Sequence, residues 1–180
     1  MLCARIITDN LWFERDLLDA DSFADIKTKN HELSVWILPD DLNDKEGVDR
    51  VGLALAMTRS KPEEFYLLII DTEEIKMNLG WDVKIESQDG DSHYKGMNSY
   101  HRNLKLYTFK DLFFMALYIG LMTNKKNYIY YNENEITDLY YKAIETEAIT
   151  SRDFEHNKEK NKWQRMFNNY INSRKERSKG

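Results

Sequence analysis

The sequence has few of the residues that interrupt or cross-link a chain. Its 180 residues include one cysteine, two prolines and seven glycines. A single cysteine, Cys3, cannot form a disulfide within the chain, so the fold does not depend on oxidation. With so few prolines and glycines, we expect long secondary-structure elements and no low-complexity linker.

Long apolar stretches are also missing. The most apolar window is LFFMALYIGLM at residues 112–122, about half of the ~20 residues that a membrane-spanning helix needs. We therefore interpret it as a buried helix and expect no membrane association. No basic segment precedes an apolar run at the start of the sequence, so we expect no signal peptide and a cytoplasmic location.

The residues that are present are those of a globular protein. Hydrophobic residues make up 42% of the chain and aromatic residues 13%, which excludes a disordered chain. The length suits one domain of ordinary size. The frequent use of Lys, Asn, Tyr and Ile indicates an A+T-rich bacterial or phage genome.

Strands are predicted from period-two alternation and from short continuous apolar runs. The run FYLLII is of strand length and is typical of a strand that is covered on both faces. If the strands on either side of residues 39–64 were parallel neighbours, they would form a right-handed crossover. The predicted strands are 4–8, 33–38, 65–70, 81–86 and 104–109, and 128–131 is a short strand or a helix extension.

Helices are predicted from three- and four-residue apolar spacing and from capping residues. Asp49 is the expected N-cap of a helix over 49–58, and Gly80 is expected to end a helix that begins at Thr72. Thr150 and Asp153 resemble a capping box that opens a final helix to about residue 177. The other predicted helices are 135–148, the buried helix from about 108 to 123, and a broken segment within 10–26.

These elements together predict an α+β fold. We expect a mixed β-sheet with packed helices, built from the strands of residues 4–109, and a largely helical C-terminal third. Residues 1–150 are expected to form a single α+β domain, and residues 151–180 a basic amphipathic C-terminal helix.

The stretch Trp81–Arg102 holds most of the reactive side chains of the chain. Histidine is the usual proton-transfer residue near neutral pH, and basic side chains beside glycine amides can hold an anion. This pattern is typical of nucleotide or phosphodiester chemistry. The candidate catalytic residues are His93, His101 and Arg102, and the candidate binding residues of the same loop are Asp89, Asp91 and Lys95.

Two other interpretations of this loop remain open. Asp89, Asp91 and His93 carry oxygen and nitrogen atoms that can bind a divalent cation. However, Asp-Gly-Asp-Ser is also typical of a polar turn, and the stretch lacks the length and the glutamate of an EF-hand loop. We therefore expect no metal site and no cofactor, and the loop could equally be structural.

The C-terminal end is basic and carries an aromatic stripe. Its last 24 residues contain eight basic and two acidic side chains, whereas the remaining residues contain 18 basic and 29 acidic side chains. The tail therefore binds nucleic acid or another acidic partner, or it folds back on the acidic body. The stripe could stack on single-stranded nucleic acid, pack on the domain, or form a seam with a partner helix or a second copy of the chain. The residues concerned are Trp163, Arg165, Phe167 and Tyr170.

The sequence therefore leaves three functions open and does not decide whether the protein is an enzyme. The leading hypothesis is a small cytoplasmic protein that binds another macromolecule, as a regulator or neutraliser. The alternatives are an enzyme of nucleotide or phosphodiester chemistry centred on the loop, and nucleic-acid binding through the basic helix. An enzyme should bring His93, His101 and Arg102 together in one concave pocket, whereas a binding protein need not.

Overall fold

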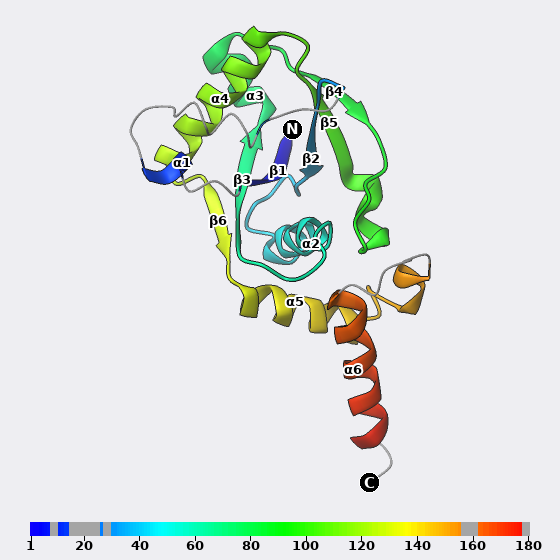
Figure 1. Ribbon diagram of the computed structural model, residues 1–180. Helices are drawn as coiled ribbons and strands as arrows, with labels where there is room; N and C mark the ends of the chain where they lie inside the picture. Colours follow the sequence, from blue (N-terminus) through cyan, green and yellow to red (C-terminus); the bar gives the residue numbers. More distant parts are fainter. Residues whose placement is uncertain (8–10, 15–25, 27–29, 156–161, 178–180) are drawn as a thin grey trace.

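The computed structural model describes residues 1–7, 11–14, 26, 30–155 and 162–177. Within them, six strands form one sheet with the order β4-β5-β2-β1-β3-β6 (Figure 1). Every paired strand is antiparallel to its neighbour. The strands are β1 (Leu2–Ile7), β2 (Glu32–Ile37), β3 (Phe65–Asp71), β4 (Lys84–Ser87), β5 (His101–Lys105) and β6 (Tyr128–Tyr131).

Helices connect these strands and extend beyond the last of them. The α+β prediction is confirmed, and the sheet that was expected to be mixed is antiparallel. The α-helices are α1 (Leu11–Glu14), α2 (Lys45–Ala56), α3 (Thr72–Leu79), α4 (Phe109–Asn124), α5 (Glu133–Glu145) and α6 (Lys162–Arg177), and the 3-10 helices are η2 (Lys95–Tyr100) and η3 (Ser151–Phe154).

The crossover considered for the first half of the chain does not form between neighbouring strands. Strands β2 and β3 are both antiparallel to β1, so they run parallel to each other. However, β1 lies between them in the sheet. The connection through α2 therefore passes over β1, and β1 is paired on both sides.

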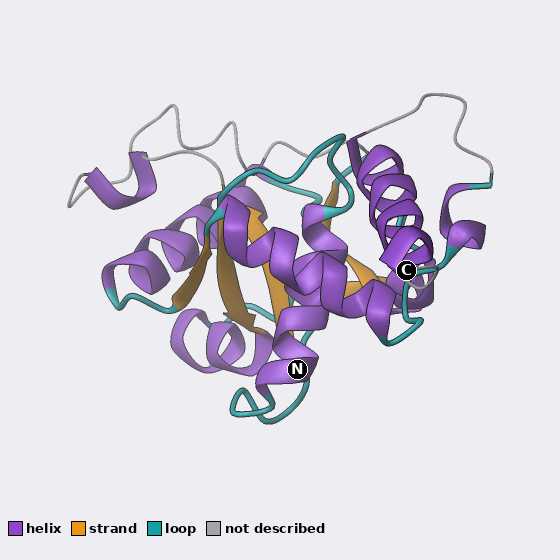
Figure 2. Ribbon diagram, turned by 90° about the horizontal axis from the view of Figure 1, so that it is seen from below, coloured by secondary structure: helices purple, strands orange, loops and turns teal. Residues whose placement is uncertain are grey.

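Helices cover both faces of the sheet, and each face has its own apolar core (Figures 1 and 2). One core joins the sheet to α2, α5 and α6, and the other joins it to α3 and α4. In β3, Leu67 and Ile69 belong to the first core, while Leu68 and Ile70 belong to the second. Because successive side chains of a strand point to opposite faces, a strand covered on both faces must be apolar throughout. This confirms the interpretation of the run FYLLII.

Helix α2 begins earlier than the sequence predicts. Its N-cap is Asp44, whose carboxylate accepts a hydrogen bond from the backbone N–H of Gly47 at 3.0 Å. The expected cap, Asp49, lies inside the helix and binds the Lys45 ammonium at 2.7 Å and the Tyr131 hydroxyl at 2.9 Å. The cap prediction was wrong because the helix begins at Lys45 and includes Gly47, although glycine is unfavourable inside a helix.

The strands around the reactive loop are also displaced from the prediction. Strand β4 begins at Lys84 rather than Trp81, and β5 spans 101–105 rather than 104–109. His101 and Asn103 are buried polar residues within β5. Period-two reasoning favours apolar residues at such positions, so it placed this strand three residues too late.

The C-terminal third differs from the prediction in one respect. Thr150 and Asp153 do form a capping box, but it opens the single turn η3 and not the final helix. Helix α6 is a separate element that projects from the body at its C-terminal end (Figure 1). Of the segment 10–26, the structure describes α1 and residue 26, and the rest of that prediction lies outside the described residues.

Helix α4 and the capping of α3 agree with the sequence. Thr108 and Asp111 form the capping box of α4, and Gly80 ends α3 with a φ of 60°. In the described part of the chain, we find no helix with the length and apolar character needed to cross a bilayer.

Candidate functional site

A pocket lies where strands β1 and β2 separate. The two strands pair at Cys3 with Ile37 and at Ala4 with Trp36. Beyond these pairs, β1 continues to pair with β3 and β2 with β5. The space between them opens into a pocket of about 390 Å³, which we call the β1–β2 pocket. Its described lining consists of Arg5, Ile6, Ser34, Trp36, Leu55, Thr58, Arg59, Asp91 and His101.

Two arginines give the pocket a basic character. The guanidinium of Arg5 spans the gap between the strands and donates to the backbone carbonyl of Ser34 at 2.9 Å. Arg59 follows α2, and its guanidinium lies 3.9 Å from the Glu63 carboxylate and 5.8 Å above the ring centroid of Phe65. Among the described residues, the lining thus contains two arginines and one histidine beside one acidic side chain, Asp91.

His101 is the buried titratable side chain of the pocket, with 8% of its surface exposed. Its Nδ1 lies 3.0 Å from the backbone carbonyl of Gln88. Because a carbonyl oxygen can only accept, Nδ1 must carry the hydrogen, which leaves Nε2 of the neutral ring as a proton acceptor. The ring meets Trp36 edge to face, with 5.6 Å between centroids. His101 is therefore held in one orientation and one tautomer.

The loop 88–94 brings Asp91 to the pocket because it is attached to α2. The buried Ser92 hydroxyl donates to the carbonyl of Ala54 at 2.6 Å and accepts from the backbone N–H of Tyr94 at 3.1 Å. The backbone N–H of His93 donates to the carbonyl of Met57 at 3.3 Å. These contacts hold the loop against the last turn of α2.

The side chain of Asn98, in η2, also binds the loop 88–94. It accepts from the backbone N–H of Ser92 at 3.0 Å and donates to the carbonyl of Ser92 at 3.2 Å. The backbone N–H of Gly90 donates to the carbonyl of Asn98 at 2.9 Å. The loop is therefore held by Asn98 of η2 as well as by α2.

The structure separates the three candidate catalytic residues. Among these described residues, His101 lines the β1–β2 pocket, whereas His93 and Arg102 are not part of its lining. The His93 ring lies 6.2 Å from the Phe154 ring, and burial lowers the pKa of His93, an effect that Asp91 opposes and Lys95 reinforces. Arg102 follows His101 in β5, and its guanidinium donates to the carbonyls of Ser99 at 2.8 Å and His101 at 2.7 Å.

The candidate binding residues of the loop are divided in the same way. Asp91 lines the pocket, whereas the described lining does not include Asp89 or Lys95. Lys95 binds η3 instead, because its backbone N–H donates to Asp153 at 3.0 Å and its ammonium donates to the carbonyl of Arg152. In the described residues, no group of three or more His, Cys, Asp or Glu side chains is arranged to hold a metal ion.

The aromatic stripe of α6 packs on the body of the same chain. Trp163 is fully buried, and its Nε1 donates to the carbonyl of Arg59 at 2.9 Å. The Phe167 ring lies 5.6 Å from the Phe154 ring, and the Tyr170 ring stacks on Tyr141 at 4.9 Å. Packing on the domain was one of the three interpretations of this stripe, beside a nucleic-acid platform and a seam with a partner helix or a second copy of the chain.

The basic side chains of α6 lie outside that contact. Arg165 and Arg174 are exposed, and the Arg174 guanidinium lies 5.8 Å above the Tyr170 ring. Lys162 pairs with Glu133 of α5 at 3.1 Å. The start of α6 thus packs on the body with one ion pair, and binding of an acidic partner by its exposed arginines stays a prediction.

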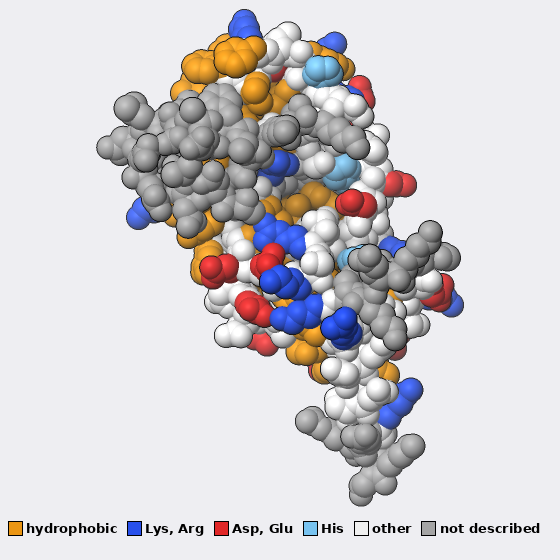
Figure 3. Space-filling model, viewed as in Figure 1, with side chains coloured by type: hydrophobic (Ala, Val, Ile, Leu, Met, Phe, Trp, Pro, Cys, Tyr) orange, Lys and Arg blue, Asp and Glu red, His pale blue; other side chains and the backbone are white. Residues whose placement is uncertain are grey.

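Sequence reasoning missed most of the pocket. No sequence pattern marks Arg5 or Arg59 as a site residue, because they are far from each other and from His93 and His101 in the sequence. They meet His101 because β1 is inserted between β2 and β3. Figure 3 shows Lys and Arg side chains, acidic side chains and a histidine close together near the middle of one face.

Comparison of the chain with models of protein families, with curated proteins and with solved structures gave no match.

Proposed function

We propose that the β1–β2 pocket binds a ligand that carries a phosphate group. The observation that carries this proposal is the convergence of Arg5, Arg59 and His101 on one pocket, in whose described lining Asp91 is the one acid. Arginine guanidinium groups match the geometry and charge of phosphate oxygens. The proposal keeps the nucleotide or phosphodiester chemistry expected for the loop and moves its centre from the histidine pair to His101.

The remaining lining supports a nucleotide-sized ligand. Ile6, Trp36 and Leu55 supply apolar and aromatic surface, and Ser34 and Thr58 supply hydroxyl groups. A volume of about 390 Å³ falls within the usual range of small-molecule sites. The pocket thus combines an apolar part for a base or sugar with a basic part for phosphate.

Calorimetric titration tests the binding. We expect AMP, ADP or a short single-stranded oligonucleotide to bind, and Arg59→Gln to weaken that binding by about tenfold or more, since a hydrogen bond to a charged group contributes about 1.5–3 kcal/mol. The matched control is Arg174→Gln, because Arg174 is exposed on α6. The mononucleotide and oligonucleotide arms show which source of phosphate is preferred.

Two results would overturn the proposal. One is the absence of binding by every phosphate compound, inorganic phosphate included, at millimolar concentration. The other is equal affinity of Arg59→Gln and Arg174→Gln for the ligand that binds.

Catalysis is tested separately, with the ligand that binds most tightly as substrate. If His101 transfers a proton, His101→Gln should lower the rate of phosphodiester hydrolysis at saturating ligand by about 10²–10⁴-fold, beyond any change in ligand affinity. Tight binding without any turnover by the wild-type protein would assign the pocket to binding or regulation and not to an enzyme.

Binding of a protein partner is the second candidate, and one face of α4 favours it. Phe109, Phe113 and Leu121 are 78%, 43% and 41% exposed, and their spacing places them along one side of the helix. Tyr107, just before α4, is 51% exposed. Solvent-exposed apolar clusters of this kind are typical of interaction surfaces. This α4 surface supports the macromolecular partner expected as the leading function.

Site-specific photocrosslinking tests the partner. A photoreactive phenylalanine analogue at Phe109 should form an adduct with one defined protein in the cells that make this chain. The same analogue at the exposed Asp82 should not. Adducts that are equally abundant at both positions, or absent at Phe109, would contradict a partner site on α4.

A further inference from the structure

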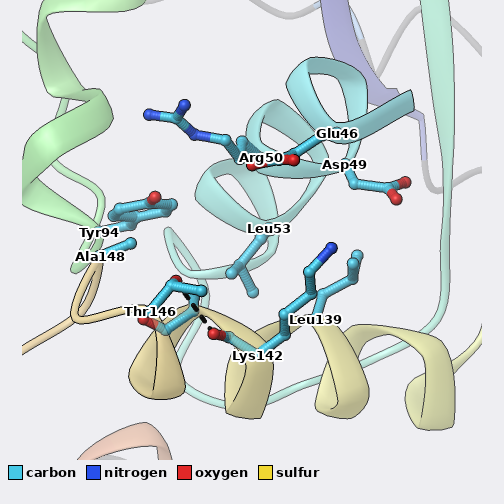
Figure 4. A pocket seen from close by; sticks show the side chains of 10 residues that line it. Glu46, Asp49, Arg50, Leu53, Tyr94, Leu139, Lys142, Thr146 and Ala148 are labelled. Carbon is cyan, nitrogen blue, oxygen red and sulfur yellow. Dashed lines mark hydrogen bonds between the residues drawn. The ribbon is translucent and has the colours of Figure 1, made fainter. Parts of the chain in front are cut away.

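A second pocket lies between helices α2 and α5, and we call it the α2–α5 pocket (Figure 4). Its volume is about 270 Å³, which suits a ligand smaller than a nucleotide. None of its described lining residues belongs to the β1–β2 pocket. That lining consists of Glu46, Asp49, Arg50, Leu53, Tyr94, Leu139, Lys142, Ala143, Thr146 and Ala148.

Side chains of both charges face this pocket. Glu46 and Arg50 extend from α2, and the ammonium of Lys142 rises from α5 toward α2 (Figure 4). Among the described residues, no ion pair joins Arg50 or Lys142 to Glu46 or Asp49. The charges of opposite sign are therefore set around the space and do not neutralise each other directly.

The groups differ in how far they are already engaged. Asp49 is bound by the Lys45 ammonium at 2.7 Å and by the Tyr131 hydroxyl at 2.9 Å. Arg50 contacts the sulfur of Met97 at 3.9 Å, a weak interaction for a guanidinium. Glu46, Arg50 and Lys142 are all exposed, so a ligand can reach them from solvent.

The rest of the lining is apolar. Leu53 of α2, with Leu139 and Ala143 of α5, supplies aliphatic surface, and the ring of Tyr94 forms one wall. The hydroxyl of Thr146 is used within α5, because it donates to the backbone carbonyl of Lys142 at 3.1 Å. A ligand would therefore meet charges at the mouth of the pocket and aliphatic groups inside it.

We propose that the α2–α5 pocket binds a free α-amino acid with an aliphatic side chain. The ligand's carboxylate would bind Arg50 and Lys142, its ammonium group would bind Glu46, and its side chain would contact Leu53, Leu139 and Ala143. A zwitterion is the small molecule that satisfies unpaired charges of both signs at once. A phosphate ligand would instead face two carboxylates here.

Calorimetric titration of the full chain with leucine, isoleucine, valine and methionine tests this inference. We expect at least one of the four to bind, and two analogues of leucine to bind at least tenfold more weakly. These are 4-methylpentanoate, which lacks the ammonium group, and 3-methylbutylamine, which lacks the carboxylate. Each analogue leaves one charge of the pocket without its partner, which is why we expect the loss.

Substitutions locate the binding. Arg50→Gln and Glu46→Gln should each weaken amino-acid binding by about tenfold, because each removes a hydrogen bond between charged groups. The matched controls are Arg174→Gln and Glu155→Gln, since both residues are exposed and lie outside the pocket.

Three results would overturn the inference. The first is that none of the four amino acids binds with a Kd of about 10 mM or lower, since a weaker Kd means negligible affinity. The second is that leucine and both analogues bind equally well. The third is that Arg50→Gln and Glu46→Gln bind amino acids as tightly as the control variants. Thermal unfolding of each variant, recorded alongside, separates loss of binding from loss of folding.

Discussion

Gly90 determines how closely the loop 88–94 approaches the β1–β2 pocket. A Cβ atom at this position would lie 2.7 Å from the Trp36 ring and 3.1 Å from the Cβ of His101. Atoms at such distances must move apart, so any other residue would push the loop away from the pocket. Glycine here serves a close contact between two segments, whereas the sequence alone suggests an ordinary turn residue.

Cys3 lies in β1 and is fully buried. Burial raises the pKa of its thiol to about 11, so very little thiolate is present at pH 8. We expect native protein to react with a disulfide reagent such as DTNB far more slowly than protein unfolded in urea.

The control for this prediction is Ser99→Cys, which places a thiol at an exposed position. Its added thiol should react at once in the folded protein. Complete labelling of Cys3 in the native state on the same time scale would contradict its burial.

His93 should make stability depend on pH. Burial lowers its pKa below the value of about 6.5 of a free histidine. Between these two pKa values the unfolded chain binds a proton that the folded chain does not. The free energy of unfolding is therefore unaffected by protonation of His93 above about pH 6.5 and decreases as the pH falls below that value. Urea unfolding between pH 7.5 and 5 should show a shallower decline for His93→Gln than for the wild type.

His31→Asn is the comparison for the pH series, because His31 is exposed with a φ of 63°, a conformation that asparagine tolerates. This variant should decline with pH as steeply as the wild type. If His93→Gln declines just as steeply, the burial of His93 does not control the acid sensitivity.

The sequence predicts well those helices and strands whose buried apolar residues follow a regular spacing. The strand β3, the helix α4 and the helix α5 are recognised from apolar runs or three- and four-residue spacing. Strand β5 is placed late, because His101, Arg102 and Asn103 pair with β2 although they are polar. Their hydrogen bonds to neighbouring segments, such as that between His101 and Gln88, compensate for burial, and a local pattern contains no trace of such partners.

Strand β3 provides the stability test at this scale. Leu68 is fully buried and belongs to the core on the α4 side of the sheet. Leu68→Ala should lower the free energy of unfolding by about 2–5 kcal/mol, because it removes buried surface and leaves a cavity. Urea unfolding measures the change, and the exposed Leu42 offers Leu42→Ala as a matched control. A loss of only a few tenths for Leu68→Ala would show that the strand is not packed on both faces.

At the scale of the whole molecule, the order of the strands determines which side chains meet. The β1–β2 pocket takes residues from β1, β2, the end of α2, the loop 88–94 and β5. The sequence identified two of them, Asp91 and His101, because both stand in a stretch rich in reactive residues. Arg5 and Arg59 could not be predicted, since their proximity results from long-range strand pairing and not from local spacing.

The attachment of α6 to the body is a property of the whole fold. Besides the bond from its Nε1, the carbonyl of Trp163 accepts from the Tyr140 hydroxyl of α5 at 2.7 Å. Trp163→Ala should lower the free energy of unfolding by about 3–5 kcal/mol. Ending the chain after Ile171 should change it little, because residues 172–175 are exposed. Urea unfolding of both variants checks the contrast, and a larger effect of the truncation would contradict it.

The loop 88–94 contributes to the walls of both pockets, through Asp91 at one and Tyr94 at the other. Ser92, between these two residues, is anchored to the carbonyl of Ala54 in α2. If the two proposed ligands bind, one that moves Asp91 or Tyr94 would also change the affinity of the other pocket. Thermodynamic linkage requires that each ligand change the affinity of the other by the same factor. Under both proposals, the concentration of the amino acid would set the affinity for the phosphate ligand, and the reverse, without any contact between the two solutes.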